Sequence, residues 1–155
     1  MANYAGAIAA LRTAFAAAWA AAYPAVPIAY PNTIPPAETW PPIDGTGAPV
    51  PWVYFEVIGN GAALRSCGAP GSLLWLYKGN IFVHVFVPAD YGTDDAEAFA
   101  VAAGEIFRAQ TFYQDGAGAK IICYAPQTDG GQKDADNGNQ WRITCSIPFE
   151  YYHHG

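Results

Sequence analysis

Residues 81–87 read IFVHVFV and are followed by Pro88, and this stretch decides the fold. Nearly all of its residues are β-branched or aromatic, which is the strongest strand signal in the chain. Successive side chains of a strand point to opposite faces. One face therefore carries Ile81, Val83, Val85 and Val87, and the other carries Phe82, His84 and Phe86. A strand that is apolar on both faces is buried on both faces. One face is expected to meet the helices of this chain, so something else has to cover the second.

The composition indicates a single domain whose surface is largely covered by neighbouring subunits. The chain has 155 residues, and we expect one domain over residues 1–155. The formal net charge of −6 argues against a surface that binds nucleic acid or anionic membrane. Charged residues make up 13% and aromatic residues 15%, which fits a subunit whose surface is largely covered by neighbours. A compact monomer with a surface rich in Gly, Pro and Ala is the alternative.

Two helices are expected. Residues 2–22 are rich in Ala, and large apolar side chains recur there at spacings of three and four residues: Tyr4, Ile8, Leu11, Phe15 and Trp19. Pro24 ends this helix. Arg12 lies inside the segment, which argues against both a signal peptide and a membrane span. The second helix covers residues 94–110 and begins with acidic residues in its first turn, which suits the helix dipole.

The other patterned segments predict strands. Residues 52–58 alternate along the strand, and residues 26–30 and 120–124 are expected to be short strands. We expect residues 73–77 and 81–87 to form one long strand with a bulge at Gly79. This strand would pair with residues 52–58 across a loop at 59–71. A two-residue hairpin turn at Gly79 and Asn80 is the alternative.

The last strand completes the fold prediction. Residues 141–150 show the cleanest half-buried alternation, and Pro148 places this strand at a sheet edge or at a bulge. The order of elements predicts an α+β fold. We expect a mostly antiparallel, mixed β-sheet of four to five strands with two main helices packed on one face.

Two segments predict long surface loops. Residues 31–51, here called the Pro-rich segment, are dense in Pro and Gly and cannot form interior sheet or helix. Ile34 and Trp40 are its candidate anchors, and a loop of this length with stiff Pro pairs favours docking on another surface. Residues 129–139 are polar and Gly-rich, which indicates a loop or a hairpin tip.

The sequence carries little that indicates catalysis or metal binding. Cys67, Cys123 and Cys145 lack a disulfide spacing, which favours reduced thiols, with Cys67 exposed. A catalytic Cys67 needs a His base. Nothing in the local sequence pairs it with His84, which we interpret as a packing residue. The adjacent residues 153–154 are both His and point opposite ways on an extended chain, so they do not chelate one ion together. We therefore expect no enzymatic activity, no cofactor and no metal.

The order of segments also resembles a known family. ALRTAFAAAWAAAYPAVPIAYPN (10–32) leads through the Pro-rich segment to PWVYFEV (51–57). IFVHVFVPADYGTDDAEAFAVAAGEIFRAQTF (81–112) and the closing WRITCSIPFEY (141–151) follow. This arrangement resembles the tail terminator family of long-tailed bacteriophages and related tail-like particles, over nearly the whole chain. The most specific parts are VHVFVPADYGTDDA with its following helix, and SIPFEY. Residues 59–71 and 129–139 carry no matching motif.

The resemblance implies a structural protein of the virion tail and neck, assembled in the cytoplasm of the host bacterium. Family members form homohexameric rings that cap the head-proximal end of the tail tube and stop its polymerisation. The implied partners are further copies of the chain, the major tail tube protein and the head-completion (stopper) connector protein. DNA would pass through the lumen without specific binding, and no membrane is involved. The alternatives are another neck or tail-completion protein such as a head-tail joining protein, a monomeric ligand-binding domain, or an enzyme that uses Cys67.

Two sets of residues follow as candidate sites. The candidate subunit or partner contacts are Ile34, Trp40, Arg65, Phe82, His84 and Phe86. A pore through which DNA slides should repel phosphate, so we expect acidic residues to face the lumen. The candidates form two alternative sets, either Asp94, Asp95 and Glu97, or Asp129, Asp134 and Asp136 of the loop at 129–139.

Overall fold

The first helix has its large side chains in the core. The computed structural model describes residues 3–155, and helix α1 (Tyr4–Ala22) follows the predicted segment, of which residue 2 lies outside the described residues. Asn3 caps α1, because its Oδ1 accepts a 2.7 Å hydrogen bond from the amide of Gly6. By length and composition alone α1 could span a membrane. Burial of Leu11, Phe15 and Trp19 in the core accounts for its apolar face.

The second helix packs closely because its buried face is made largely of small residues. Helix α2 (Asp94–Phe107) ends before the predicted position 110, since Arg108 leaves helical geometry at φ −52° and ψ 116°. Gly104 is needed for the close approach of the helix to the sheet. A Cβ there would lie 2.7 Å from Pro126 and 3.1 Å from Sγ of Cys145.

The sheet has eight strands, more than the four to five expected from the sequence. The longer strands are β2 (Trp52–Leu64), β3 (Leu74–Pro88), β5 (Lys120–Cys123) and β8 (Gln140–His154). The two-residue strands are β1 (Ile28–Ala29), β4 (Thr111–Phe112), β6 (Gln127–Thr128) and β7 (Gln132–Lys133). The sequence does not reveal the strands β4, β6 and β7, because a strand of two residues is too short to show a periodic pattern.

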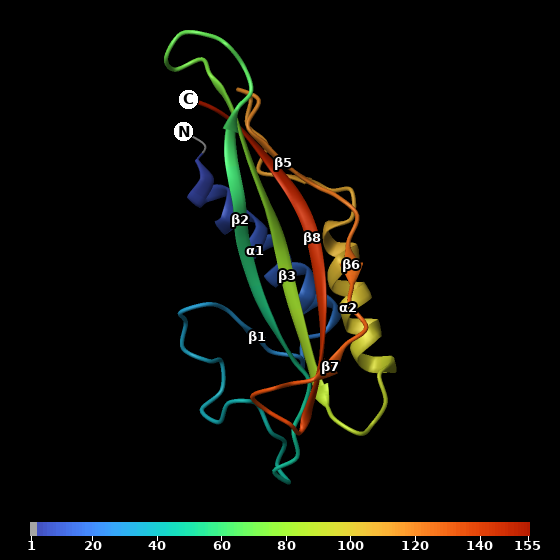
Figure 1. Ribbon diagram of the computed structural model, residues 1–155. Coiled ribbons are helices and arrows are strands. Elements are labelled where there is room, and N and C mark those ends of the chain that lie inside the picture. Colours follow the sequence, from blue (N-terminus) through green and yellow to red (C-terminus); the bar gives the residue numbers. More distant parts are fainter. Residues whose placement is uncertain (1–2) are drawn as a thin grey trace.

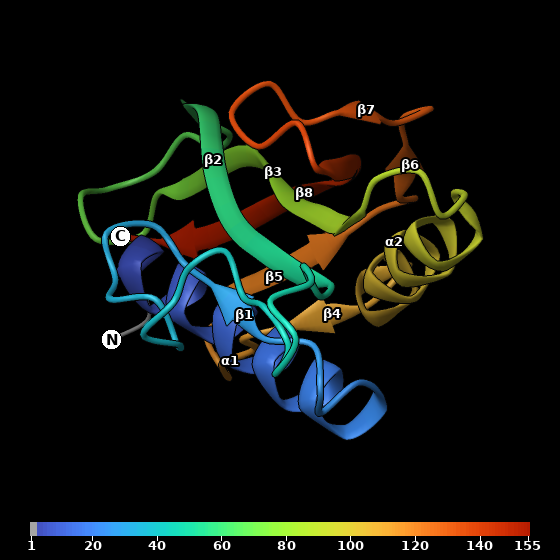
Figure 2. The same ribbon diagram turned by 90° about the horizontal axis from the view of Figure 1, so that it is seen from below.

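The strand order is β1-β2-β3-β8-β5-β4, and β6 and β7 pair with β8. β1 runs parallel to β2 and the other pairs are antiparallel. Both helices cover the same face of the sheet, as Figures 1 and 2 show. That inner face carries the core, which includes Ile81, Val83 and Val85 of β3. The predicted α+β class and the single covered face are therefore confirmed.

The long central strand is confirmed, but its bulge lies elsewhere. Gly79 pairs in register with Gly59 of β2 and with Phe149 of β8. The extra residue is in β2, between Gly59 and Gly61, where Gly61 takes φ +146°. β2 also continues to Leu64, so the connecting loop covers residues 65–73 rather than 59–71.

Pro148 does not mark an edge strand, because β8 lies between β3 and β5. On the β5 side, β5 pairs with residues 149–152 and β6 with residues 145–146. Pro148 falls in the gap between these two pairings, where its carbonyl accepts a 2.9 Å hydrogen bond from the Tyr124 amide. A strand interior tolerates a proline where no ladder donor is needed.

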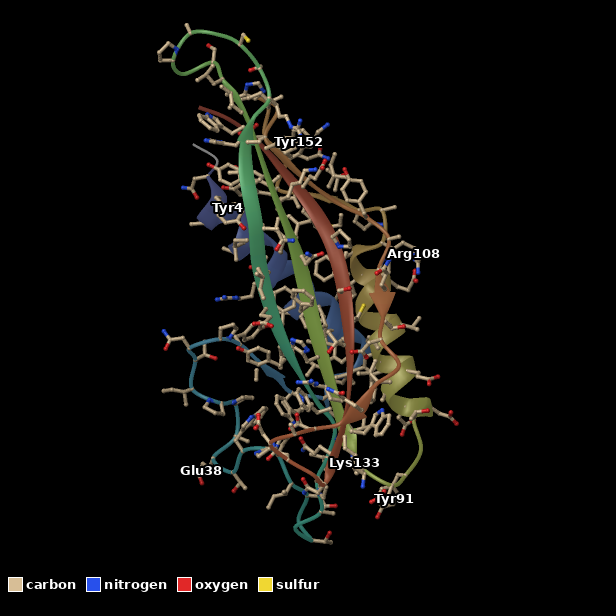
Figure 3. All side chains as sticks on the ribbon, viewed as in Figure 1. Tyr4, Glu38, Tyr91, Arg108, Lys133 and Tyr152 are labelled. Atoms are coloured by element: carbon tan, nitrogen blue, oxygen red, sulfur yellow. The ribbon has the colours of Figure 1, made fainter. Side chains whose placement is uncertain are left out.

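The molecule is elongated along the strands (Figure 1). We call the end that carries residues 65–73 the hairpin end, and the opposite end, which carries residues 89–93 and 134–139, the loop end. The last residue of the chain is fixed at the hairpin end, because Gly155 and Leu73 exchange backbone hydrogen bonds of 3.0 and 3.2 Å. Figure 3 shows Tyr152 toward the hairpin end and Glu38, Tyr91 and Lys133 toward the loop end.

Candidate assembly surfaces

The face of the sheet opposite the helices, here called the outer face, holds a groove of about 450 Å³ near the hairpin end. Residues of β2, β3 and β8 line it, together with Tyr124. Leu76 forms a buried apolar part of the lining and is 3% exposed. Lys78 and Glu150 add charged groups to the same lining. The groove thus combines apolar surface with a few fixed polar groups.

Glu150 is the centre of the polar part of this groove. Its Oε2 accepts hydrogen bonds from the hydroxyls of Tyr124 at 2.8 Å and Tyr152 at 2.9 Å. Lys78 Nζ lies 3.3 Å from its Oε1. The hydrogen bond from Tyr124 is the main reason that the pKa of Glu150 is lowered. The same bond raises the pKa of Tyr124 to about 12. Three donors therefore hold an ionised carboxylate in one place.

His84 lies on the outer face of the central strand. Its Nε2 is 3.0 Å from Oε1 of Glu56, and its Nδ1 is 2.8 Å from Oγ1 of Thr144. The Glu56 side chain is 27% exposed and that of His84 is 20% exposed. Both ring nitrogens have a partner, which fits the interpretation of His84 as a satisfied packing residue.

Near the loop end the chain covers part of the outer face itself. Trp52 stacks on Phe86 with ring centroids 4.0 Å apart, and Trp40 meets Trp52 edge-on at 4.7 Å. Trp52 Nε1 donates a 3.2 Å hydrogen bond to Oε1 of buried Gln140. Trp40 therefore anchors the Pro-rich segment on the sheet and shields Trp52 and, beneath it, Phe86.

The structure does not bring together the one thiol and histidine that were weighed as catalytic partners. Cys67 is exposed in the loop at the hairpin end, whereas His84 lies in the middle of β3. Cys123 and Cys145 are buried, and burial raises the pKa of their thiols to about 12 and about 11. Among residues 3–155, no three His, Cys, Asp or Glu side chains are grouped as metal ligands.

The family described as phage tail terminator protein matches residues 7–149, nearly the whole chain. The chain belongs to the phage tail terminator family. This is a family of structural proteins of the phage tail, which makes the protein a tail component that interacts with other tail components. No curated protein matches the chain significantly.

The fold of this tail terminator family member also occurs in a solved structure that bears no functional name. The two superpose with a TM-score of 0.60 at 19% sequence identity, over 94% of this chain and 95% of the other. At that identity the likeness concerns the fold alone. It shows that the arrangement of two helices on one face of the sheet is not peculiar to this sequence.

The predicted contact residues occupy different parts of the surface. Ile34 is 92% exposed on the Pro-rich segment, whereas Trp40 packs on Trp52. Arg65 is exposed at the start of the hairpin loop, where its amide donates to the Leu74 carbonyl at 2.8 Å. Phe82 is half-buried on the outer face. Its ring lies nearly parallel to that of His84, with the ring centroids 6.1 Å apart. Their role as contacts with other subunits stays a prediction.

The six candidate lumen acids differ in how free their carboxylates are. Asp94, Asp95 and Glu97 lie exposed in the first turn of α2, and Asp136 is exposed in the loop before β8. Asp129 Oδ1 accepts hydrogen bonds from the amides of Gly131 and Thr144, both at 3.0 Å. Asp134 is only 7% exposed and accepts from both the amide and the side chain of Asn137. The carboxylates of Asp129 and Asp134 are thus used in hydrogen bonds within the protein, which hold residues 129–139 in place and, at Thr144, against β8.

Charge is segregated along the molecule. Residues 31–51, 89–97 and 129–139 contain nine acids and one base, Lys133. The rest of the chain contains four acids and six bases. The three acidic segments lie at or beside the loop end (Figures 1 and 3). The domain is therefore strongly acidic at one end and slightly basic over the remainder.

The sequence does not reveal the hydrogen-bond and ion-pair network of Glu150. It also does not reveal that one aromatic and one aliphatic side chain, Tyr91 and Ile43, are exposed. Glu150 reads as an ordinary polar position of an alternating strand, and two of its three partners, Lys78 and Tyr124, stand far away in the sequence. The only available signal is that it alternates with apolar residues on a strand rich in Tyr. Tyr91, 88% exposed, and Ile43, 47% exposed, lie in loops, where no periodicity distinguishes them.

Proposed function

We propose that this protein forms a homohexameric ring that caps the head-proximal end of a phage tail tube. The ring ends tube polymerisation and gives the head-completion connector protein a docking surface. The observation that carries this proposal is the family match over residues 7–149. The number six and the identity of the partners come from the family resemblance.

The exposed parts of the surface support an assembly role. The helices cover only the inner face, so much of the outer face, including Phe82 and the groove at Glu150, is open to a neighbour. Large apolar side chains also protrude from loops: Ile34 and Tyr91 are 92% and 88% exposed. Interfaces between proteins are enriched in such anchors. Ring contacts are proposed to use Ile34, Arg65, Phe82 and His84.

The charge segregation supports a passive role toward DNA. In a ring whose subunits share one orientation, the acidic segments of all subunits gather at the same rim or at the pore. Asp94, Asp95, Glu97 and Asp136 are the exposed acids proposed to face the DNA path. Carboxylates repel the phosphate backbone. DNA then slides past the ring without being held.

Deletion of the gene from the phage that encodes this chain tests the proposal. Loss of a terminator is expected to give tail tubes longer than normal, seen by electron microscopy. Normal-length tails detached from filled heads would instead identify a head-tail joining protein and overturn the capping role. Normal infectious particles would overturn a tail role altogether.

A matched pair of variants then tests the acidic residues. Asp94→Lys with Asp95→Lys is expected to reduce plaque formation in a complementation assay, whereas Glu105→Lys on the same helix is expected to complement. If the double variant complements as well as the Glu105→Lys control, Asp94 and Asp95 do not line the path of the DNA.

A further inference from the structure

The outer edge of β2 is largely unpaired. β1 pairs only with Val53 and Tyr54 of β2. Beyond Phe55, no other backbone group within residues 3–155 pairs along this edge, although β2 continues to Leu64. Residues 58–64 are all exposed. Figures 1 and 2 show this half of β2 at the border of the sheet. Such an edge presents a row of free amide and carbonyl groups to any other strand.

The usual protection of an edge strand is mostly missing here. Edges are commonly blunted by charged side chains, by proline or by a covering loop. Residues 57–64 contain no charge and no proline. Ile58 and Leu64 are 45% and 49% exposed. The bulge between Gly59 and Gly61 bends the strand, but pairing with β3 resumes at Gly61 and runs to Leu64. The edge is long enough for a strand of ordinary length.

The opposite edge of the sheet offers no matching strand. It consists of β4, β6 and β7, each two residues long, and of β5, which begins with the charged Lys120. A second copy of this chain therefore carries only one described edge of the same length and character, which is its own β2. The lack of charge over residues 57–64 means that two such edges meet without like-charge repulsion.

We propose that two copies of the free protein pair through their β2 edges, antiparallel about a two-fold axis, so that one sheet runs through both. Such an isologous contact closes on itself with two subunits. The pair is therefore a state of the free subunit that goes beyond the proposed ring, whose contacts must repeat around a circle.

The faces of β2 fix the register of the pair. Val57 lies opposite Ile81 and Leu64 opposite Trp75, so both belong to the inner face, whereas Ile58 and Ala63 belong to the outer face. A register that keeps each face continuous puts Val57 beside Leu64 of the second copy and Ile58 beside Ala63. Small side chains at residues 59–62 then allow close approach of the two strands.

The mass of the purified full-length protein in solution tests the pairing. Light scattering after size-exclusion chromatography is expected to give twice the subunit mass at tens of micromolar. Ile58→Lys with Leu64→Lys places like charges along the edge and is expected to weaken the dimer by about tenfold or more. Val101→Lys, at a 53% exposed position of α2, is the matched control and should leave the dimer unchanged. Circular dichroism confirms that the variants are folded.

A disulfide test checks the register. In a Cys67→Ser background, Ile58→Cys with Ala63→Cys is expected to give a covalent dimer under mild oxidation, and Ile58→Cys with Leu64→Cys, on opposite faces, much less. A wild-type monomer at about 100 µM would overturn the proposal. A dimer or hexamer that the Lys variants do not affect would also overturn the proposal. The same holds for a monomeric protein in which the β2 edge becomes covered only after another tail protein is added. None of these results depends on tube length in the deletion phage, so the ring proposal is tested separately.

Discussion

Gly79 of β3 leaves the space that the ring of Phe149 in β8 occupies. The two residues are cross-strand partners, and a Cβ on Gly79 would lie 2.7 Å from two carbons of that ring. It would also lie 2.6 Å from the carbonyl oxygen of Ile58 on the other neighbouring strand. Phe149 is 1% exposed, so the ring has little room to move away.

We therefore expect Gly79→Ala to destabilise the protein by about 1–3 kcal/mol, the usual cost of overpacking. Urea unfolding followed by tryptophan fluorescence measures the change. Gly116→Ala is the control, because a Cβ there meets nothing within 4 Å. If the Gly79→Ala variant is as stable as the control, the side chain of Phe149 can adopt another conformation that avoids the added Cβ.

Glu150 should make stability depend on pH in the acid range. Its pKa is lowered in the folded state from an ordinary value of 4.5, so its contribution is fully present above that value and is lost as pH falls through the folded pKa. Glu150→Gln is expected to cost about 1 kcal/mol near pH 7 and progressively less toward about pH 3.

Unfolding free energies at the two pH values measure this difference. Glu105→Gln is the control, since its partner Arg108 and Glu105 itself are 51% and 50% exposed and such pairs contribute little. A Glu150→Gln deficit that is the same at both pH values would show that the charge is not the source of stability.

Trp40 should determine how firmly the Pro-rich segment is held. Removing its ring uncovers Trp52, and we expect Trp40→Ala to cost about 1–2 kcal/mol, less than the ~3–5 kcal/mol of a fully buried aromatic residue. The same change should speed proteolytic cleavage within residues 31–51. Ile34→Ala, at a 92% exposed position, should change neither quantity. Equal cleavage of both variants would argue that other residues anchor the segment.

The three cysteines should differ sharply in reactivity. Cys67 is exposed, while burial raises the pKa of Cys123 and Cys145 to about 12 and about 11. A thiol reagent at about pH 8 is expected to label one thiol in the folded protein and all of them in denaturant. Cys67→Ser should abolish the fast labelling. A second fast thiol in the wild type would indicate local opening of the sheet.

Local sequence patterns predicted the elements whose signal lies within a few residues. The stripe of α1 and the inner face of β3 follow directly from the spacing of their apolar residues. The sequence predicted that something other than the helices covers the second face of β3, and within the described residues that cover is partial, because Phe86 lies under Trp52 while Phe82 stays partly open. Trp40 of the Pro-rich segment covers Trp52. No local sequence pattern shows that these two rings meet.

Features that depend on long-range register could not be predicted. The bulge lies in β2, between Gly59 and Gly61, and the sequence around Gly79 does not reveal which of the two paired strands carries the extra residue. Pro148 is tolerated in a central strand because β5 and β6 leave a gap opposite it, which requires knowing both pairings. The Glu150 network likewise joins residues of β3 and β8 with Tyr124, which follows β5, only after the sheet has formed.

The ladder between β3 and β8 has a mechanical consequence. The two strands pair without interruption from Leu74 with His154 to Pro88 with Gln140. Hydrogen bonds of an antiparallel pair run across the strands, so tension between the hairpin end and the loop end loads them in shear and all together. A pull applied across the strands at one end would instead peel them apart one pair at a time. The domain is therefore stiffest along the direction in which its sheet is longest, and a load along that axis is shared by the whole ladder.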